Sequence, residues 1–173
     1  LSVRAGRVLS IELDKALKPV LGETLSGRTV TRSAGVGRYD VTLKVTSQKG
    51  DVKELTVERA CVIYPAEVRV ETAANPAWPW DTAANAFTNL AEALEECVDG
   101  MTIRVGAGAY PVAERITVSK AVNIIGAGMY RTTFYRSISD RMQVLMLDNA
   151  NAYVAELAVT NGSVSGSDHG GGV

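Results

Sequence analysis

The pattern of hydrophobic and polar positions predicts short β-strands along most of the chain. In the clearest strand, residues 39–46, apolar side chains occupy every second position. Such alternation places one apolar and one polar face on a strand. A Gly-containing turn at residues 47–51 predicts a hairpin with a second strand, which runs from Leu55 to Tyr64, before Pro65. The alternation slips at residues 58–60, which indicates a β-bulge or a change of sheet.

Only residues 82–98 show the 3.6-residue period of an amphipathic helix. Asp81 or Thr82 is expected to cap its start, and Gly100 is placed to end it in a left-handed conformation. The three glutamates fall off the apolar stripe, on a solvated face. The stripe consists of Phe87, Leu90, Ala91, Leu94 and Val98, and the glutamates are Glu92, Glu95 and Glu96.

After Gly100 the pattern changes to strands of three to five residues, separated by Gly-rich turns. Strands at Ile103, Ile124 and Leu145 follow one another at intervals of 21 residues. A fixed period of this length, with short strands and Gly-rich corners, is typical of a solenoid. The chain is therefore expected to be mostly β, with a single substantial helix.

The predicted hairpin resembles the end of a polycystic-kidney-disease (PKD) repeat. The resemblance rests on residues 37–46, the turn that follows and the second strand. PKD repeats are immunoglobulin-like β-sandwiches that serve as spacers in bacterial secreted proteins, so the resemblance implies a whole or incomplete sandwich over residues 1–65. The family's Trp/Phe-Gly-Asp-Gly turn has no counterpart before Gly35.

Residues 66–173 resemble the N-terminal cap and first coils of pectin-lyase-like right-handed parallel β-helices. Three sequence segments carry the resemblance. They are the predicted helix ending in Asp99-Gly100, the strand of residues 102–105 followed by Gly-x-Gly-x-Tyr, and residues 122–128. The resemblance implies a truncated β-helix whose capping α-helix covers apolar side chains and unpaired strand edges. The fold expected for the whole chain is thus an immunoglobulin-like β-sandwich followed by the N-terminal part of a right-handed parallel β-helix.

Composition and charge narrow the class of protein. The formal net charge is −1, so no basic field favours nucleic acid as a partner. No apolar run is long enough for a membrane-spanning helix, and the chain begins at Leu1 without the basic start of a signal peptide. We expect a fragment of a secreted or cell-surface bacterial protein, cut at both ends, whose signal peptide lies outside it.

The loop of residues 75–81 contains the candidate carbohydrate contacts, Trp78 and Trp80. Aromatic ring faces stack on the apolar faces of sugars. A polysaccharide or a host or cell-surface glycan is the partner expected on this basis. The alternative is that both rings pack at the junction between the two modules.

No catalytic site is recognisable. Ser119-Lys120 fits a nucleophile–base pair by composition only, and a solvated lysine is the simpler interpretation. Asp168-His169 offers too few ligands for a closed metal site, and His169 is the only histidine. The four acidic residues near the predicted strands form no recognisable acid–base pair. They are Glu114, Asp140, Asp148 and Glu156.

Two further motifs have structural interpretations. Gly126-Ala127-Gly128 matches half of a dinucleotide-binding fingerprint, but a strand rather than a helix is predicted after it, so we interpret it as a corner turn. The two cysteines, Cys61 and Cys97, fall in different predicted modules and are expected to be buried thiols. No cofactor is expected, and nothing in the sequence supports a Ca²⁺ site.

Two classes of function remain. The first is an extracellular binding, adhesin-like or structural module. The second is the N-terminal part of a polysaccharide lyase or glycoside hydrolase whose active site lies beyond residue 173. The lack of a catalytic constellation favours the first. An uncovered last coil is also expected to allow self-association through its unpaired strands.

Overall fold

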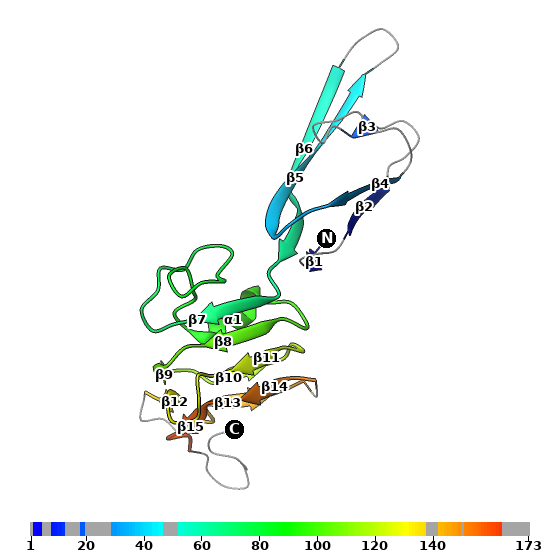
Figure 1. Cartoon of the computed structure of the whole chain (residues 1–173). Coiled ribbons are helices and arrows are strands. Elements are labelled where there is room, and N and C mark those ends of the chain that lie inside the picture. Colours follow the sequence, from blue (N-terminus) through cyan, green and yellow to red (C-terminus); the bar gives the residue numbers. More distant parts are fainter. Residues whose placement is uncertain are drawn as a thin grey trace. The chain divides into compact units, whose positions relative to one another are not determined.

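The computed structural model describes residues 2–4, 8–12, 18–19, 29–46, 52–137, 142–149 and 151–163. Strands make up most of the secondary structure, and among these residues there is one short helix (Figure 1). The chain divides into two compact units, Leu1–Pro65 and Ala66–Val173. In the described part of the chain, no helix has the length and apolar character required to cross a membrane.

The first unit contains a four-stranded sheet and a two-stranded sheet. The larger sheet has the order β1-β6-β5-β3 and the smaller pairs β2 with β4. Among the described strands of this unit, only β1 and β6 pair in parallel. The strands are β1 (Ser2–Arg4), β2 (Val8–Glu12), β3 (Lys18–Pro19), β4 (Thr29–Ser33), β5 (Gly37–Thr46) and β6 (Val52–Tyr64). The antiparallel pairing of β5 with β6 confirms the predicted hairpin, whose turn at residues 47–51 lies outside the described residues.

The bulge predicted at residues 58–60 is also confirmed. Tyr39 pairs with Cys61, but Val41 pairs with Val57, so β6 has extra residues opposite Asp40. Arg59 has a φ of 50°, and its backbone N–H donates to the Asp40 carboxylate at 2.7 Å. The bulge therefore satisfies an N–H group that the ladder leaves unpaired.

Tyr39 stabilises the start of β5 through a hydrogen bond and through packing of its ring. The Tyr39 hydroxyl donates to the carbonyl of Gly35 at 2.9 Å, and the ring packs against the buried Cys61 and Ile63. A Cβ atom at Gly37 would lie 2.8 Å from this ring. The absence of a side chain at Gly37 is thus what lets the ring fold back over the chain.

The second unit contains three parallel sheets, here called the first, second and third sheets. The first has the order β14-β11-β8-β7, the second β15-β12-β9 and the third pairs β10 with β13. The strands of the first sheet are β7 (Glu67–Val70), β8 (Thr102–Val105), β11 (Asn123–Ile125) and β14 (Tyr153–Ala155). Those of the other two are β9 (Gly108–Val112), β12 (Thr132–Arg136), β15 (Ala158–Thr160), β10 (Ile116–Val118) and β13 (Leu145–Leu147).

The chain visits the three sheets in a fixed order, and each circuit stacks on the one before. β8, β9 and β10 are followed by β11, β12 and β13, which pair with them in parallel, and then by β14 and β15 (Figure 1). Apolar side chains in register form columns through the interior. Val68, Ile103 and Ile124 make one buried column, and the rings of Tyr110 and Phe134 stack in another with centroids 5.1 Å apart.

The predicted 21-residue period holds for one circuit only. Ile124 pairs with Ile103 as expected, but the next residue of that column is Val154 rather than Leu145. Leu145 instead pairs with Ile116 in the third sheet. The second circuit is longer because the connections before β12 and β13 are longer than the connections before β9 and β10. Extra residues in the connections lengthen a circuit without disturbing the paired strands.

The predicted helix over residues 82–98 is wrong in its first half. The helix α1 is Leu90–Glu96, and its N-cap is Asn89, whose side chain accepts the Glu92 N–H at 2.9 Å. It ends before Cys97, so Gly100, despite its φ of 77°, does not terminate it.

Competing hydrogen bonds explain the shorter helix. The Thr82 N–H and hydroxyl both donate to the Asn85 side chain at 2.8 Å, which closes a local turn instead of capping a helix. The backbone of Phe87 bonds to β7, since its N–H donates to Arg69 and its carbonyl accepts from Glu71. A residue whose main chain pairs with a strand cannot also continue a helix.

The outer edge of β7 is covered by this loop. The Arg69 N–H donates to the carbonyl of Trp80 at 2.8 Å, next to the two bonds that Phe87 makes. α1 contacts both β7 and β10 and buries Leu90, Ala93 and Leu94. Loop and helix together therefore close the N-terminal end of the first sheet.

Candidate functional site

A groove lies between α1 and the strands β9 and β10. It consists of two pockets that share Ala91, Glu114 and Ile116 as lining residues. The apolar pocket, of about 370 Å³, is lined by Thr88, Asn89, Leu90, Ala91, Tyr110, Pro111, Val112, Ala113, Glu114, Ile116 and Phe134. The charged pocket, of about 540 Å³, is lined by Ala91, Leu94, Glu95, Glu114, Arg115, Ile116, Thr117, Ser119 and Lys120.

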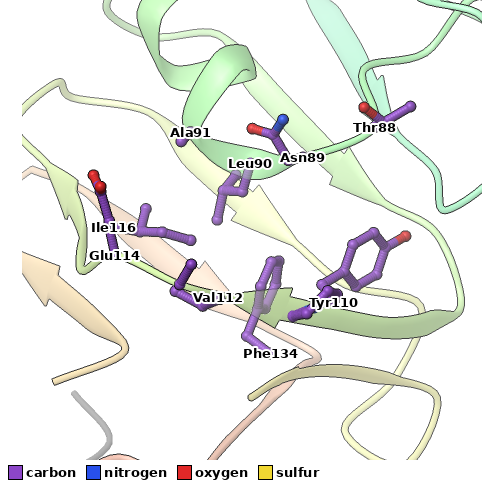
Figure 2. A pocket seen from close by; sticks show the side chains of 11 residues that line it. Thr88, Asn89, Leu90, Ala91, Tyr110, Val112, Glu114, Ile116 and Phe134 are labelled. Carbon is purple, nitrogen blue, oxygen red and sulfur yellow. The ribbon is translucent and has the colours of Figure 1, made fainter. Parts of the chain in front are cut away.

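The apolar pocket lies between the start of α1 and β9. Figure 2 shows Leu90 pointing from the helix toward Val112 and Phe134. The Tyr110 hydroxyl donates to the carbonyl of Gly106 at 3.1 Å, and burial raises its pKa to about 12, to which the nearby carboxylate of Glu71 adds. The phenol is therefore neutral at physiological pH, so Tyr110 gives the pocket an apolar ring rather than an acid or a base.

Lys120 binds the end of α1. Its ammonium group donates to the carbonyls of Leu94 at 2.6 Å, Glu95 at 2.7 Å and Cys97 at 2.7 Å. These are three of the carbonyls that a helix C-terminus leaves without intrahelical partners. The expectation of a solvated lysine is thus wrong. An ammonium group with all three N–H bonds in use is a structural cap and not the base of a Ser119-Lys120 pair.

Both cysteines are buried free thiols, as expected. Burial raises the pKa of the Cys97 thiol to about 12, although Lys120 lowers it and Glu96 raises it further. A thiol with so high a pKa is a poor nucleophile. Cys97 is therefore a buried packing residue at the C-terminal end of α1.

The two tryptophans differ in exposure. Trp80 is only 8% exposed and stacks on Phe87 with ring centroids 4.6 Å apart. Trp78 is half-buried and meets Trp80 edge to face at 5.0 Å. The ring of Trp80 thus packs within the second unit, and Trp78 is the ring that a sugar could reach.

The predicted acidic residues are spread over different connections. Glu114 precedes β10, Asp148 follows β13 and Glu156 follows β14, all exposed. Asp140, Asp168 and His169 lie outside the described residues. Across the described ranges, no three His, Cys, Asp or Glu residues gather as metal ligands would.

The Gly-x-Gly motifs form corners between the first and second sheets. A strand follows each, so Gly126-Ala127-Gly128 presents no helix N-terminus to a pyrophosphate. The buried hydroxyl of Thr132 links the two corners, because it accepts the Ala127 N–H at 2.9 Å and donates to the Gly106 carbonyl at 3.0 Å. The corner-turn interpretation therefore holds.

Sequence reasoning missed the groove itself. Glu95 was placed on a solvated face, and it is exposed, but it also lines the charged pocket beside Glu114. One signal was available, namely Pro111 within an otherwise strand-like stretch. Proline is confined largely to edge strands, so it marks β9 as a strand with a free edge.

Comparisons with known proteins do not add a function to this geometry. No family model matches the chain, and no curated protein or solved structure matches it significantly.

Proposed function

We propose that the chain is a binding or structural module of a secreted or surface-displayed bacterial protein, adhesin-like in type. In this proposal residues 1–65 are a PKD-like, immunoglobulin-like spacer and residues 66–173 are the capped first coils of a right-handed parallel β-helix. The observation that carries it is the repeated circuit of the second unit, in which three sheets are visited in one order with parallel register. Elongated solenoids of this kind present extended surfaces.

Tyr39 supports the proposed immunoglobulin-like spacer. Its hydroxyl bonds to the backbone four residues upstream, at Gly35. Immunoglobulin-like sandwiches use a tyrosine near the start of a strand in this way, as a tyrosine corner. The buried Cys61 and Ile63 beneath its ring would belong to the sandwich core.

Paired cysteines test the coil arrangement. Thr102 and Asn123 are register partners and alternate with buried residues, so both side chains face outward. The pair Thr102→Cys with Asn123→Cys should form a disulfide on mild oxidation, since neighbouring strands lie within bridging distance. The pair Thr102→Cys with Ile125→Cys is two residues out of register and should not. Equal cross-linking of both pairs would refute the arrangement.

A polysaccharide or a host or cell-surface glycan is the proposed partner, with Trp78 as a contact. The test is binding of the chain to an array of bacterial and host glycans, repeated with Trp78→Ala. Binding that is lost in this variant while the thermal unfolding midpoint is unchanged would support the proposal. Glycan binding that is unaffected by Trp78→Ala would show that Trp78 does not contact the glycan.

The competing proposal is the N-terminal part of a polysaccharide lyase or glycoside hydrolase. One observation favours it, since Glu95 and Glu114 line the same pocket and such enzymes use pairs of carboxylates. Incubation with polygalacturonate, alginate and neutral glycans decides between the proposals. We expect no product. Release of sugar that is abolished by Glu114→Gln, but not by the corresponding change at exposed Glu156, would establish the enzyme instead.

A further inference from the structure

Two places in the chain combine a carboxylate or amide side chain with a following glycine. They are Asp99-Gly100 and Asn161-Gly162, the only Asp-Gly and Asn-Gly pairs in the sequence. In such a pair the backbone nitrogen of the glycine can attack the side-chain carbonyl carbon, because glycine has no Cβ atom to hinder the approach. Both Asp99 and Asn161 are exposed, so exposure does not distinguish the two pairs.

The Asp99-Gly100 pair is held by hydrogen bonds to the residue that leads into β11. The Gly100 N–H donates to the carbonyl of Ala121 at 2.6 Å, and the Asp99 carboxylate accepts the Ala121 N–H at 2.9 Å. The attacking nitrogen and the carboxyl group are thus both bound to one residue. Ring closure between them would break both hydrogen bonds, so the fold protects this pair.

The Asn161-Gly162 pair lies in the bend that follows β15. Asn161 has a φ of 60°, in the left-handed region that asparagine adopts more readily than most residues. Among the described residues, neither the Asn161 side chain nor the Gly162 N–H has a hydrogen-bond partner. In this part of the chain, the attacking nitrogen and the amide group therefore lack the bonds that hold Asp99-Gly100.

The main chain is attached to the second circuit on both sides of this bend. Thr160 is the register partner of Tyr135, and the Ser163 N–H donates to the carbonyl of Met142 at 3.0 Å. The segment from Thr160 to Ser163 therefore connects two fixed points. A change in its main-chain length would strain one attachment or the other.

We infer that Asn161 is a site of spontaneous deamidation in the folded chain, and that the fold protects Asp99 from the corresponding reaction. Asparagine is among the thermolabile residues. The Gly162 nitrogen bonds to Cγ of Asn161, the bond from Cγ to Nδ2 breaks, and the amide group leaves as ammonia with the proton of the Gly162 N–H. Water then opens the resulting succinimide. Cleavage at Cγ gives aspartate, and cleavage at the backbone carbonyl gives isoaspartate, whose main chain runs through Cβ and Cγ.

The two products alter the bend differently. Either one carries a carboxylate in place of a neutral amide, so a negative charge is added at neutral pH. Isoaspartate also inserts a methylene group into the main chain between Thr160 and Ser163. The bond from Ser163 to Met142 should therefore weaken in the isoaspartate form and persist in the aspartate form. The inference depends on this bend and not on glycan binding or secretion.

The experiment is incubation of the full chain in warm, mildly alkaline buffer, with a parallel sample unfolded in urea. Mass spectrometry of proteolytic peptides follows the gain in mass at Asn161, and enzymatic methylation of isoaspartate follows both pairs. We expect Asn161 to convert in both samples and Asp99 to convert only in urea. Asn151, an exposed asparagine that precedes Ala152, is the internal control and should convert several-fold more slowly than Asn161.

Two variants separate the reaction from its effect on the bend. Gly162→Ala places a methyl group beside the attacking nitrogen and should slow conversion of Asn161 several-fold in the folded chain. Asn161→Asp supplies the aspartate product directly, without the extra methylene group. Hydrogen exchange at the Ser163 amide should be faster in the purified isoaspartate form than in the unmodified chain, and unchanged in Asn161→Asp.

Three results would overturn the inference. One is conversion of Asn161 in urea with none in the folded chain, which would show that the fold protects this pair as well. Another is conversion of Asp99 at the same rate in both samples, which would remove the protective role of Ala121. The third is conversion of Asn151 as fast as Asn161, since the glycine would then have no influence. Equal exchange at Ser163 in all forms would refute the effect on the bend.

Discussion

The first and second sheets have similar strands, β8 and β9, in the first circuit, but the edge on the N-terminal side is covered in the first sheet and lies beside a groove in the second. β8 and β9 both bury alternate apolar side chains, with Ile103 in one and Tyr110 in the other. Beyond β8 lie β7 and then the backbones of Trp80 and Phe87, so the edge is closed. Beyond β9 lies the groove. The comparison teaches that closure of a sheet edge depends on which remote segment reaches it, and not on the pattern of the strand itself.

Two isoleucines of the first circuit provide the strongest test of this difference. Ile103 is 0% exposed in β8, which β7 covers, and Ile116 is 8% exposed in β10 and lines both pockets of the groove. Ile103→Ala should cost about 4 kcal/mol of unfolding free energy, because a sealed cavity forms, and Ile116→Ala about 2 kcal/mol, because water can enter. Urea denaturation of both variants measures this. Equal losses would mean that β10 is covered as tightly as β8.

Substitutions at two corner glycines test whether the neighbouring circuit is more rigid than the residues that follow β7. A methyl group at Gly126 would overlap the backbone carbonyl of Glu156, whereas one at Gly106 would overlap the side-chain carboxylate of Glu71. Backbone of the next circuit cannot move aside, but a carboxylate can. Gly126→Ala should therefore cost about 3 kcal/mol and Gly106→Ala about 1 kcal/mol. Thermal unfolding provides the comparison, and a larger loss at Gly106 would show that the cap is as rigid as a coil.

Lys120 is the link between the end of α1 and the first circuit. Lys120→Gln removes a charged donor from three carbonyls and should cost about 2 kcal/mol, since such bonds are stronger than neutral ones. Arg115→Gln removes a nearby exposed positive charge and should change stability by less than about 0.5 kcal/mol. Denaturation in urea distinguishes the two. If both variants unfold alike, the helix end is held by packing alone.

The burial of Cys97 should make the unfolding free energy decrease at alkaline pH and leave it unchanged near neutral pH. Burial raises the pKa of this thiol from 9.0 to about 12 in the folded chain, so the unfolded chain ionises first as pH rises. The stability linked to this group is complete below pH 9.0 and declines as the pH rises toward 12. Cys97→Ala should flatten that decline between pH 9 and 11 in urea titrations. A parallel decline in both proteins would assign it to other groups.

Much of the local structure was predictable from neighbouring residues. The alternation in β5 and β6, the slip at residues 58–60 and the Gly-rich corners all involve contacts between residues close in sequence or across one hairpin. In these elements the local preference and the tertiary contacts agree, which is why the pattern alone was sufficient.

The candidate site was less predictable, because its residues meet only through folding. Ala91 and Glu114 line one groove although the strands β8 and β9 lie between them in the sequence. Pro111 signalled an edge strand, but not which segment would leave that edge uncovered. Of the predicted carbohydrate contacts, the structure leaves Trp78 accessible and uses Trp80 in packing against Phe87.

The sequence by itself determined the strand-forming stretches, the hairpin of the first unit and the corners of the second, because periodicity and glycine positions act over a few residues. Only the tertiary structure decided the length of α1, the column that Leu145 joins and the role of Lys120. The partners of Leu145 and Lys120 lie more than twenty residues away in the sequence, and those of the Phe87 backbone lie 16 and 18 residues away. The helical period at residues 82–89 was overridden since the Phe87 backbone gained two hydrogen bonds to β7, and no local pattern encodes that edge.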